Sequence, residues 1–299
     1  MKIPIIFLGT STTVPTAERN HTAIFLKYKS ENILIDCGEG TQRQFRKAKI
    51  NPCKLTKILI THWHGDHVLG LPGLFQTLAF NGYKKTLEIY GPVGTKKFIK
   101  GLFKAFIIKK RIKLKVHEVK GKFIKTKDFE ISAKELQHSC PVNGYLFEEK
   151  PKLKIDKNKL KKLKISPKDK KQLSRLTKGK DIKINGKTIK SKNLTYKQAS
   201  KKISFILDTK KCKNAEKLAQ DSDIAIIEST LDANEKLAGR YKHLTVIQAA
   251  KIAKKAKVKR LILTHISQRY EYKSKHLEKI AKKIFPNTTI AKDFMKVEV

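Results

Sequence analysis

The order of apolar and amphipathic segments along this chain predicts an α/β fold with four layers, in which two face-to-face sheets lie between outer helices (an αββα sandwich). Three observations carry this prediction. Runs of strands are followed by helices, this order occurs in two successive halves, and polar residues follow the ends of several apolar strands. With 299 residues, the chain can form one large layered domain or two small ones.

The elements of the first half follow from local composition. Apolar segments predict strands at 3–8, 22–26, 32–35 and 58–60. A helix is expected to start at the Leu71-Pro72-Gly73-Leu74 stretch, and another is expected over 94–106.

The second half repeats this pattern. Strands are predicted at 129–133, 203–207, 224–227 and 260–264, because these segments combine apolar, β-branched and aromatic residues. Helices are predicted at 215–220, 246–256 and 276–284. Thr245 is expected to cap the second of them, and Pro286 to stop the third.

Between the strands predicted at 129–133 and 203–207 lies a lysine-rich segment, residues 150–202, with about twenty Lys and Arg against three Asp. It contains short groups of apolar residues. It also contains a hairpin pattern over 181–189, whose Asn185-Gly186 pair is a strong turn signal. We therefore expect one domain built from 1–149 and 203–299, with 150–202 inserted into it. A partly disordered insertion is the alternative.

The densest chemical signal is the segment 61–67, which directly follows the strand predicted at 58–60. It holds His62, His64, Asp66 and His67, and imidazole and carboxylate are ligands that suit zinc and similar divalent ions. On a turn that leaves a buried strand, the first two histidines can face one metal ion while Asp66 and His67 face a second. The alternative is a polar turn that happens to be rich in histidine.

Three further donors stand where predicted strands end, namely His138, Asp208 and His265. Each alone is weak, since a histidine after a strand is more often a hydrogen-bonded structural residue. Because binding sites gather at strand ends in layered folds, these three donors and the histidine cluster, which are four strand-end groups, together predict a metal site.

Motifs along nearly the whole chain resemble the ribonuclease Z family of the metallo-β-lactamase superfamily. Besides the histidine cluster, these motifs are Phe7-Leu8-Gly9-Thr10, Pro15-Thr16-Ala17-Glu18-Arg19-Asn20, Asp36-Cys37-Gly38-Glu39-Gly40-Thr41-Gln42, Gly70-Leu71-Pro72-Gly73, Gly144-Tyr145, the pair Glu228 and His243, and Thr264-His265-Ile266-Ser267-Gln268-Arg269-Tyr270. The histidine cluster alone specifies only the superfamily. The Glu39-Gly40-Thr41-Gln42 segment, Arg269-Tyr270 after His265, and the pair Glu228 and His243 narrow the resemblance to the family.

The resemblance implies a zinc-dependent endoribonuclease that removes the 3′ trailer from precursor tRNA. It also implies two Zn²⁺ per subunit, a homodimer, and a protruding basic arm at 150–202 that grips the tRNA. The arm's usual glycine-proline element is not visible, and 165–169 stands in its place. By resemblance, His62, His64 and His138 bind the first zinc, while Asp66, His67 and His265 bind the second, and Asp208 bridges both.

Other residues support this site in the expected mechanism. Asp66 can orient or deprotonate a water, and His243 held by Glu228 can protonate the leaving group. Asp36 is expected to accept a ring N–H from a ligand histidine, or alternatively to be a turn aspartate. His243 can also merely precede the helix capped by Thr245.

Contacts to the RNA are expected from a small group of polar residues. An arginine can grip a phosphate with two hydrogen bonds, and surface salt bridges are the alternative for the whole group. The group consists of Thr16, Arg19, Asn20, Ser267 and Arg269.

Composition agrees with an anionic partner. A net charge of +42 and a pI of about 10.1 favour nucleic acid, although a lysine-rich genome would produce the same bias. No apolar run approaches the length of about 18 residues that a membrane helix needs, and no signal-peptide pattern is visible. The four cysteines show no paired metal spacing. We expect the protein to be in the cytoplasm with its thiols reduced. Cys140 is expected to be a small buried residue.

Two rival functions remain open at this point. One is another metallo-β-lactamase-fold phosphodiesterase or thioesterase that acts on a small substrate and needs no basic arm. The other is an RNA-binding protein without catalysis, which the full ligand set argues against.

Overall fold

The computed structural model describes residues 2–106, 112–162, 172–184 and 187–299. The chain divides into two compact units. The larger unit consists of Met1–Lys125, Ile131–Phe147 and Lys202–Val299, and the smaller unit of Thr126–Glu130 and Glu148–Lys201.

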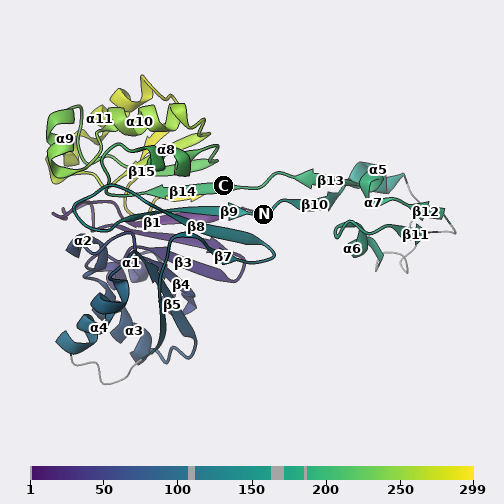
Figure 1. Ribbon diagram of the computed structural model, residues 1–299, viewed down its shortest axis with the longest axis horizontal. Coiled ribbons are helices and arrows are strands. Elements are labelled where there is room, and N and C mark those ends of the chain that lie inside the picture. Colours follow the sequence, from purple (N-terminus) through teal and green to yellow (C-terminus); the bar gives the residue numbers. More distant parts are fainter. Residues whose placement is uncertain (1, 107–111, 163–171, 185–186) are drawn as a thin grey trace. The chain divides into compact units, whose positions relative to one another are not determined.

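Two seven-stranded sheets form the framework of the larger unit (Figure 1). The first sheet runs in the order β18 (Lys296–Glu298), β1 (Pro4–Gly9), β2 (Ala23–Tyr28), β3 (Glu31–Ile35), β4 (Lys57–Leu59), β5 (Thr86–Gly91) and β6 (Lys113–Glu118). The second runs in the order β17 (Thr288–Ile290), β16 (Arg260–Thr264), β15 (Ile224–Glu228), β14 (Lys202–Ile206), β9 (Asn143–Glu149), β8 (Phe129–Glu135) and β7 (Gly121–Lys125).

Each sheet contains a block of parallel strands. Strands β3 to β6 are parallel in the first sheet, and strands β14 to β17 are parallel in the second. The carboxyl ends of neighbouring parallel strands lie at one edge of a sheet, where α/β folds build their sites.

Helices cover the outer face of each sheet (Figure 1). On the first sheet, α1 (Thr41–Lys47), α3 (Leu71–Phe80) and α4 (Thr95–Ala105) share an apolar core with the strands. On the second, α8 (Lys213–Ala219), α10 (Val246–Lys255) and α11 (Ser274–Lys282) do the same. The helices α2 (Gly65–Val68) and α9 (Glu235–Tyr241) lie in connections.

The inner faces of the sheets pack directly on each other. The rings of Tyr28 and Phe147 meet edge to face with centroids 5.2 Å apart. The buried Tyr145 hydroxyl donates to the Ile60 carbonyl at 2.6 Å, which ties the second sheet to the strand end before the histidine cluster. The predicted α/β four-layer αββα fold is therefore confirmed.

Several bounds differ from the sequence prediction by one or two residues. The helix expected from 215 begins at Lys213, and the strand expected to reach 207 ends at Ile206. Thr245 caps α10 as predicted, because its hydroxyl accepts from the Gln248 N–H and the Gln248 side chain accepts from the Thr245 N–H.

The smaller unit has its own small apolar cluster around Leu176, Ile182, Ile184 and Leu194. Its elements are β10 (Lys152–Ile155) paired with β13 (Thr195–Gln198), β11 (Ile182–Ile184) paired with β12 (Lys187–Ile189), and the helices α5 (Lys157–Lys161), α6 (Leu173–Leu176) and α7 (Ser191–Leu194). The strands of the expected hairpin thus pair, while its Asn185-Gly186 turn and the stretch 165–169 lie outside the described residues.

Candidate metal centre

The donors predicted from the sequence meet where strands of the larger unit end. Asp36 follows β3, the histidine cluster follows β4, His138 follows β8, Asp208 follows β14 and His265 follows β16. Seven buried or half-buried side chains therefore converge from both sheets, and they are His62, His64, Asp66, His67, His138, Asp208 and His265.

A close approach of backbone brings the Asp36 loop to the histidine cluster. A Cβ added to Gly38 would lie 2.4 Å from the Asp66 carbonyl oxygen, so only glycine fits there. The Cys37 N–H donates to the His67 carbonyl at 2.7 Å and fixes the contact.

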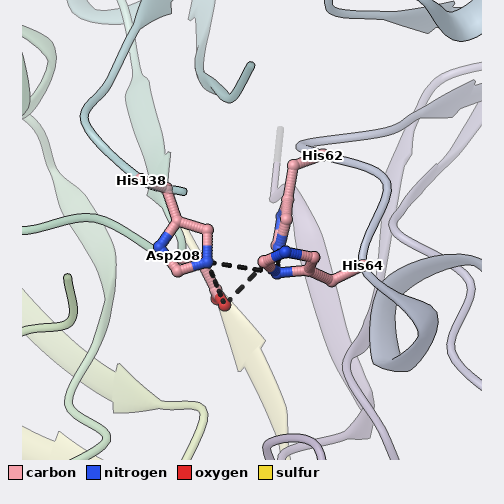
Figure 2. Close-up of side chains that lie close together, drawn as sticks. All are labelled: His62, His64, His138 and Asp208. Atoms are coloured by element: carbon pink, nitrogen blue, oxygen red, sulfur yellow. Dashed lines mark hydrogen bonds and ion pairs between the residues drawn. The ribbon is translucent and has the colours of Figure 1, made fainter. Parts of the chain in front are cut away.

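The first donor set comprises His62, His64, His138 and Asp208, whose side chains point toward one another in Figure 2. The Nδ1 atom of His64 lies 3.0 Å from His62 Nε2 and 3.1 Å from His138 Nε2. Asp208 Oδ2 lies 3.6 Å from His62 Nε2 and 3.9 Å from His138 Nε2.

The second donor set comprises Asp66, His67, His265 and the same Asp208. The Nε2 atoms of His67 and His265 lie 3.3 Å and 3.2 Å from Asp208 Oδ1. Both nitrogens also lie 3.4 Å from Asp66 Oδ2. Each oxygen of Asp208 therefore faces a different donor set.

These spacings fit metal ions. Four donors at zinc–nitrogen distances of about 2.0–2.1 Å stand roughly 3.3 Å apart in a tetrahedron. Among the described residues, Asp208 Oδ1 is a buried oxygen with no hydrogen-bond donor, which a cation would satisfy. The fold and the two donor sets therefore indicate a metal-binding site.

The electrostatics of the site point the same way. Burial lowers the pKa of His62 and keeps its ring neutral, as a metal ligand must be. Burial alone would lower the pKa of His67, but the carboxylates of Asp208, Asp36 and Asp66 outweigh it and raise that pKa. This excess of negative charge is what a bound cation would neutralise.

Backbone strain marks the site as well. Asp36, Asp208 and His265 have positive φ angles of 57°, 36° and 60°, a region that residues other than glycine rarely adopt. All three follow strand ends, and the turn redirects each side chain toward the cluster. Such strain gathers at functional sites, where the surrounding structure holds it in place.

Hydrogen bonds to the other ring nitrogens set the tautomers. Asp36 accepts from His67 Nδ1 at 2.7 Å, as the sequence analysis expected, and the Lys242 carbonyl accepts from His138 Nδ1 at 3.1 Å. In both rings Nδ1 must carry a proton to make this bond, so Nε2 is the nitrogen left to bind a metal ion in the donor set.

Beside the second donor set, Glu228 accepts from His243 Nδ1 at 3.0 Å. Burial lowers the pKa of His243, but the charge and hydrogen bond of Glu228 outweigh it and raise the pKa to about 9. The His243 ring is therefore a protonated group at neutral pH, poised next to the donors.

The amino-acid sequence is similar to those of known proteins over nearly its whole length. The chain is 39% identical over 298 residues to the ribonuclease Z of Methanothermobacter thermautotrophicus, covering 99% of this chain and 96% of that protein. It is 40% identical to the ribonuclease Z of Enterococcus faecalis, covering 99% and 97% of the two chains. This chain belongs to the ribonuclease Z family.

Solved structures and a family model add to this. The short form of human tRNase Z is 27% identical and superposes with a TM-score of 0.68, covering 98% of both chains. A metallo-β-lactamase fold protein of Bacillus subtilis, 18% identical with a TM-score of 0.70 over all of both chains, shares the fold. Residues 3–109 match the family model described as Anti-Pycsar protein Apyc1.

A cavity of about 450 Å³ opens onto the donors in this member of the ribonuclease Z family. Of the expected RNA contacts, Ser267 and Arg269 line it together with His64, Asp208 and His243. The structure thus brings these two residues to the metal centre.

The structure places Thr16, Arg19 and Asn20 elsewhere, along a second cavity of about 470 Å³. Arg19 is buried, and one of its guanidinium nitrogens donates to the Thr10 hydroxyl and the Ala291 carbonyl, each at 2.7 Å. Its Nε lies 3.7 Å from the Glu271 carboxylate, so Arg19 does form a salt bridge, but a buried one rather than the surface salt bridge left open as the alternative.

Three residues that the sequence did not predict contact histidines of the donor sets. Thr61 contacts His62, Thr230 contacts His265, and the Lys242 carbonyl holds His138. For the threonines a signal existed, since Thr61 precedes His62 in the cluster and Thr230 stands two residues after Glu228. Cys140 is half-buried rather than buried, with Sγ 3.8 Å from His64 Nε2.

Proposed function

We propose that this chain is a metal-dependent endoribonuclease that removes the 3′ trailer from precursor tRNA. Cleavage of the P–O3′ bond would leave a 3′ hydroxyl on the tRNA and a 5′-phosphate on the trailer. The main observation behind this proposal is that two donor sets share Asp208 and lie beside the Glu228–His243 pair. The chain that carries them is a member of the ribonuclease Z family.

The proposed cofactor is two Zn²⁺ per subunit. His62, His64 and His138 would hold one ion, Asp66, His67 and His265 the other, and Asp208 would contribute one oxygen to each. Imidazole-rich sets with few carboxylates suit zinc better than magnesium or calcium. When bound, such a pair supplies an activated water and stabilises charge on the phosphate oxygens.

The protein's own groups would move the protons. Asp66 lies in the donor set and would orient the attacking water or take its proton. His243 lines the same cavity and would give its proton to the leaving 3′ oxygen, while Glu228 keeps the ring charged and oriented. General acid catalysis of this kind contributes about a hundredfold to ten-thousandfold in rate.

Contacts to the RNA would come from both cavities. Ser267 and Arg269 line the metal cavity, where a guanidinium can hold a phosphate next to the cleaved bond. At the second cavity, Thr16 and Asn20 would contact RNA farther along the strand, whereas the buried Arg19 would hold their loop in place.

The lysine-rich segment 150–202 would serve as an RNA-binding arm. Its many lysines carry charge that phosphates neutralise with release of counterions, and this binding requires no base recognition. Lys183, Lys187 and Lys192 of the smaller unit are exposed and available for such contacts.

Assembly and location complete the proposal. The ribonuclease Z family membership supports a homodimer, in which the arm of one subunit would hold the tRNA cut by the other. A stable, fully active monomer in gel filtration would contradict this. The four free cysteines support a cytoplasmic location. Among the described residues, no helix has the length and apolarity to cross a bilayer.

The decisive experiment is incubation of the purified protein with end-labelled precursor tRNA, with and without a chelator. We expect a single cut that yields mature-length tRNA with a 3′ hydroxyl, lost on chelation and restored by zinc. Cleavage that survives complete metal removal would contradict the site. Hydrolysis of small phosphodiesters or thioesters without any cut in the precursor would favour a small-substrate hydrolase instead.

A further inference from the structure

Two threonines, one from each half of the metal centre, make the same unusual set of contacts. Thr61 donates its backbone N–H to Asp36 Oδ1 at 2.7 Å and its hydroxyl to Asp36 Oδ2 at 2.7 Å. The same hydroxyl oxygen lies 3.1 Å from Nδ1 of His62 in the first donor set.

Thr230 repeats this arrangement in the other sheet. Its hydroxyl donates to Glu228 Oε2 at 2.7 Å, and its backbone N–H points to the same oxygen at 3.3 Å. The hydroxyl oxygen lies 2.9 Å from Nδ1 of His265 in the second donor set.

Counting protons fixes the direction of each bond. Asp36 accepts from both donors of Thr61 and from His67 Nδ1. Because a carboxylate whose oxygens all accept can donate nothing, the single hydroxyl proton of Thr61 goes to Asp36. His62 Nδ1 must then be the donor to the hydroxyl oxygen, which leaves its Nε2 lone pair facing the metal site.

The same count applies to the second threonine. Glu228 accepts from the Thr209 N–H, from His243 Nδ1 and from the Thr230 hydroxyl. The hydroxyl proton of Thr230 therefore goes to Glu228, and His265 Nδ1 donates to the hydroxyl oxygen. A valine in this place would leave His265 Nδ1 without an acceptor and free the ring to turn.

We propose that Thr61 and Thr230 are paired positioning residues. The hydroxyl of each accepts a hydrogen bond from one ligand histidine and donates one to a buried carboxylate, and it thereby fixes the tautomer with which that histidine binds metal. Thr61 acts on the first donor set and Thr230 on the second. The inference rests on the proposed two-ion site, but it concerns metal retention and holds whatever RNA the enzyme cuts.

The relay also links the two parts of the active site. Glu228 holds His243 directly and His265 through Thr230. One carboxylate therefore sets the orientation of both the proposed general acid and a metal ligand. Loss of the Thr230 hydroxyl would loosen both, whereas loss of the Thr61 hydroxyl would leave the His243 pair intact.

A purely structural role is the competing explanation, and the chain offers a matched control. Thr264 is a fully buried threonine next to His265, and its hydroxyl has no hydrogen-bond partner among the described residues. Thr264→Val makes the same isosteric change at the same depth without touching a ligand ring. Any general effect of a buried valine should appear there too.

The test measures bound zinc by elemental analysis while folded protein is dialysed against rising chelator concentrations, without RNA. We expect Thr61→Val and Thr230→Val each to release zinc at about tenfold to hundredfold lower chelator, the usual cost of removing a partner of a ligand histidine. Thr61→Ser, Thr230→Ser and Thr264→Val should retain both ions as the wild type does.

Retention of both ions by Thr61→Val and Thr230→Val, matching Thr264→Val, would overturn the proposal. Circular dichroism checks folding. If a valine variant is unfolded, the comparison passes to alanine against serine at that position, and equal metal retention by the two would equally overturn it. Since no RNA is present, failure of the proposed tRNA cleavage would leave this result unchanged, and the two ideas are tested separately.

Discussion

The larger and smaller units of this chain use polar residues in opposite ways. In the larger unit, Asp36, Asp208 and Glu228 are buried and held by hydrogen bonds or facing histidines. In the smaller unit, lysines stand exposed on a framework whose described residues form a cluster of four buried apolar side chains. Metal chemistry needs donors fixed within fractions of an ångström, whereas electrostatic attraction of RNA needs only exposed charge. The contrast predicts that damage to the larger unit abolishes chemistry, and damage to the smaller unit weakens binding.

The largest effect is expected from Asp208→Ala. This change removes the oxygens that both donor sets share, so bound metal should fall toward zero and cleavage to background. Elemental analysis and the precursor-tRNA assay measure the two results. RNA binding, followed by a filter or mobility-shift assay, should persist. Cleavage at the wild-type rate would refute the site.

His243→Ala should come next, with kcat reduced about a hundredfold or more because the proton donor is lost. Metal content should stay at the wild-type level, which separates this variant from Asp208→Ala. An unchanged rate would exclude His243 as the general acid.

The pH profile sharpens the assignment of this pair. Since the protonated form of His243 is the acid and its pKa is raised to about 9, kcat should fall as pH rises through that value. Glu228→Gln removes the charge that raises the pKa, so the alkaline limb should move to lower pH. An identical profile in both proteins would contradict the role of Glu228.

A moderate effect is expected when Lys183, Lys187 and Lys192 are changed together to glutamine. The KM for precursor tRNA should rise about tenfold and its salt dependence should weaken, because three phosphate contacts are lost. Hydrolysis of a small phosphodiester should be unaffected. Changing the exposed Lys251, Lys254 and Lys279 of the larger unit removes the same charge and serves as the control. Equal losses in both triple variants would indicate that only net charge matters.

The smallest effect should follow Cys140→Ser. The thiol lies 3.8 Å from His64 Nε2, on the side of the ring away from the donor set that His64 Nδ1 faces. Metal content and kcat should both equal those of the wild type. A lost equivalent of zinc would instead make Cys140 a ligand.

For the larger unit, the sequence predicted which donor side chains come together, because each of them follows an apolar strand segment. His138, Asp208 and His265 lie far apart in the chain, yet each was found from the apolar run before it. Strand β6, which reads Lys-Leu-Lys-Val-His-Glu, was missed because charged residues alternate with half-buried ones and no apolar run appears.

Other features were out of reach of sequence reasoning for a different reason. Arg19 was expected to contact RNA or to form a surface salt bridge, and only the folded chain brings the Thr10 hydroxyl and the Ala291 carbonyl to its guanidinium. The positive φ angles of Asp36, Asp208 and His265 are likewise a property of the assembled site, since no local turn signal marks all three.

The division of Asp208 between the donor sets has a consequence for how the protein fills with cations. One oxygen faces each set, so the first ion to arrive would pull the carboxylate into place for the second. Uptake should therefore be cooperative, with few molecules carrying a lone ion. With the proposed two zinc ions, a cell short of zinc would contain a mixture of fully loaded and empty enzyme, and activity would respond steeply to supply.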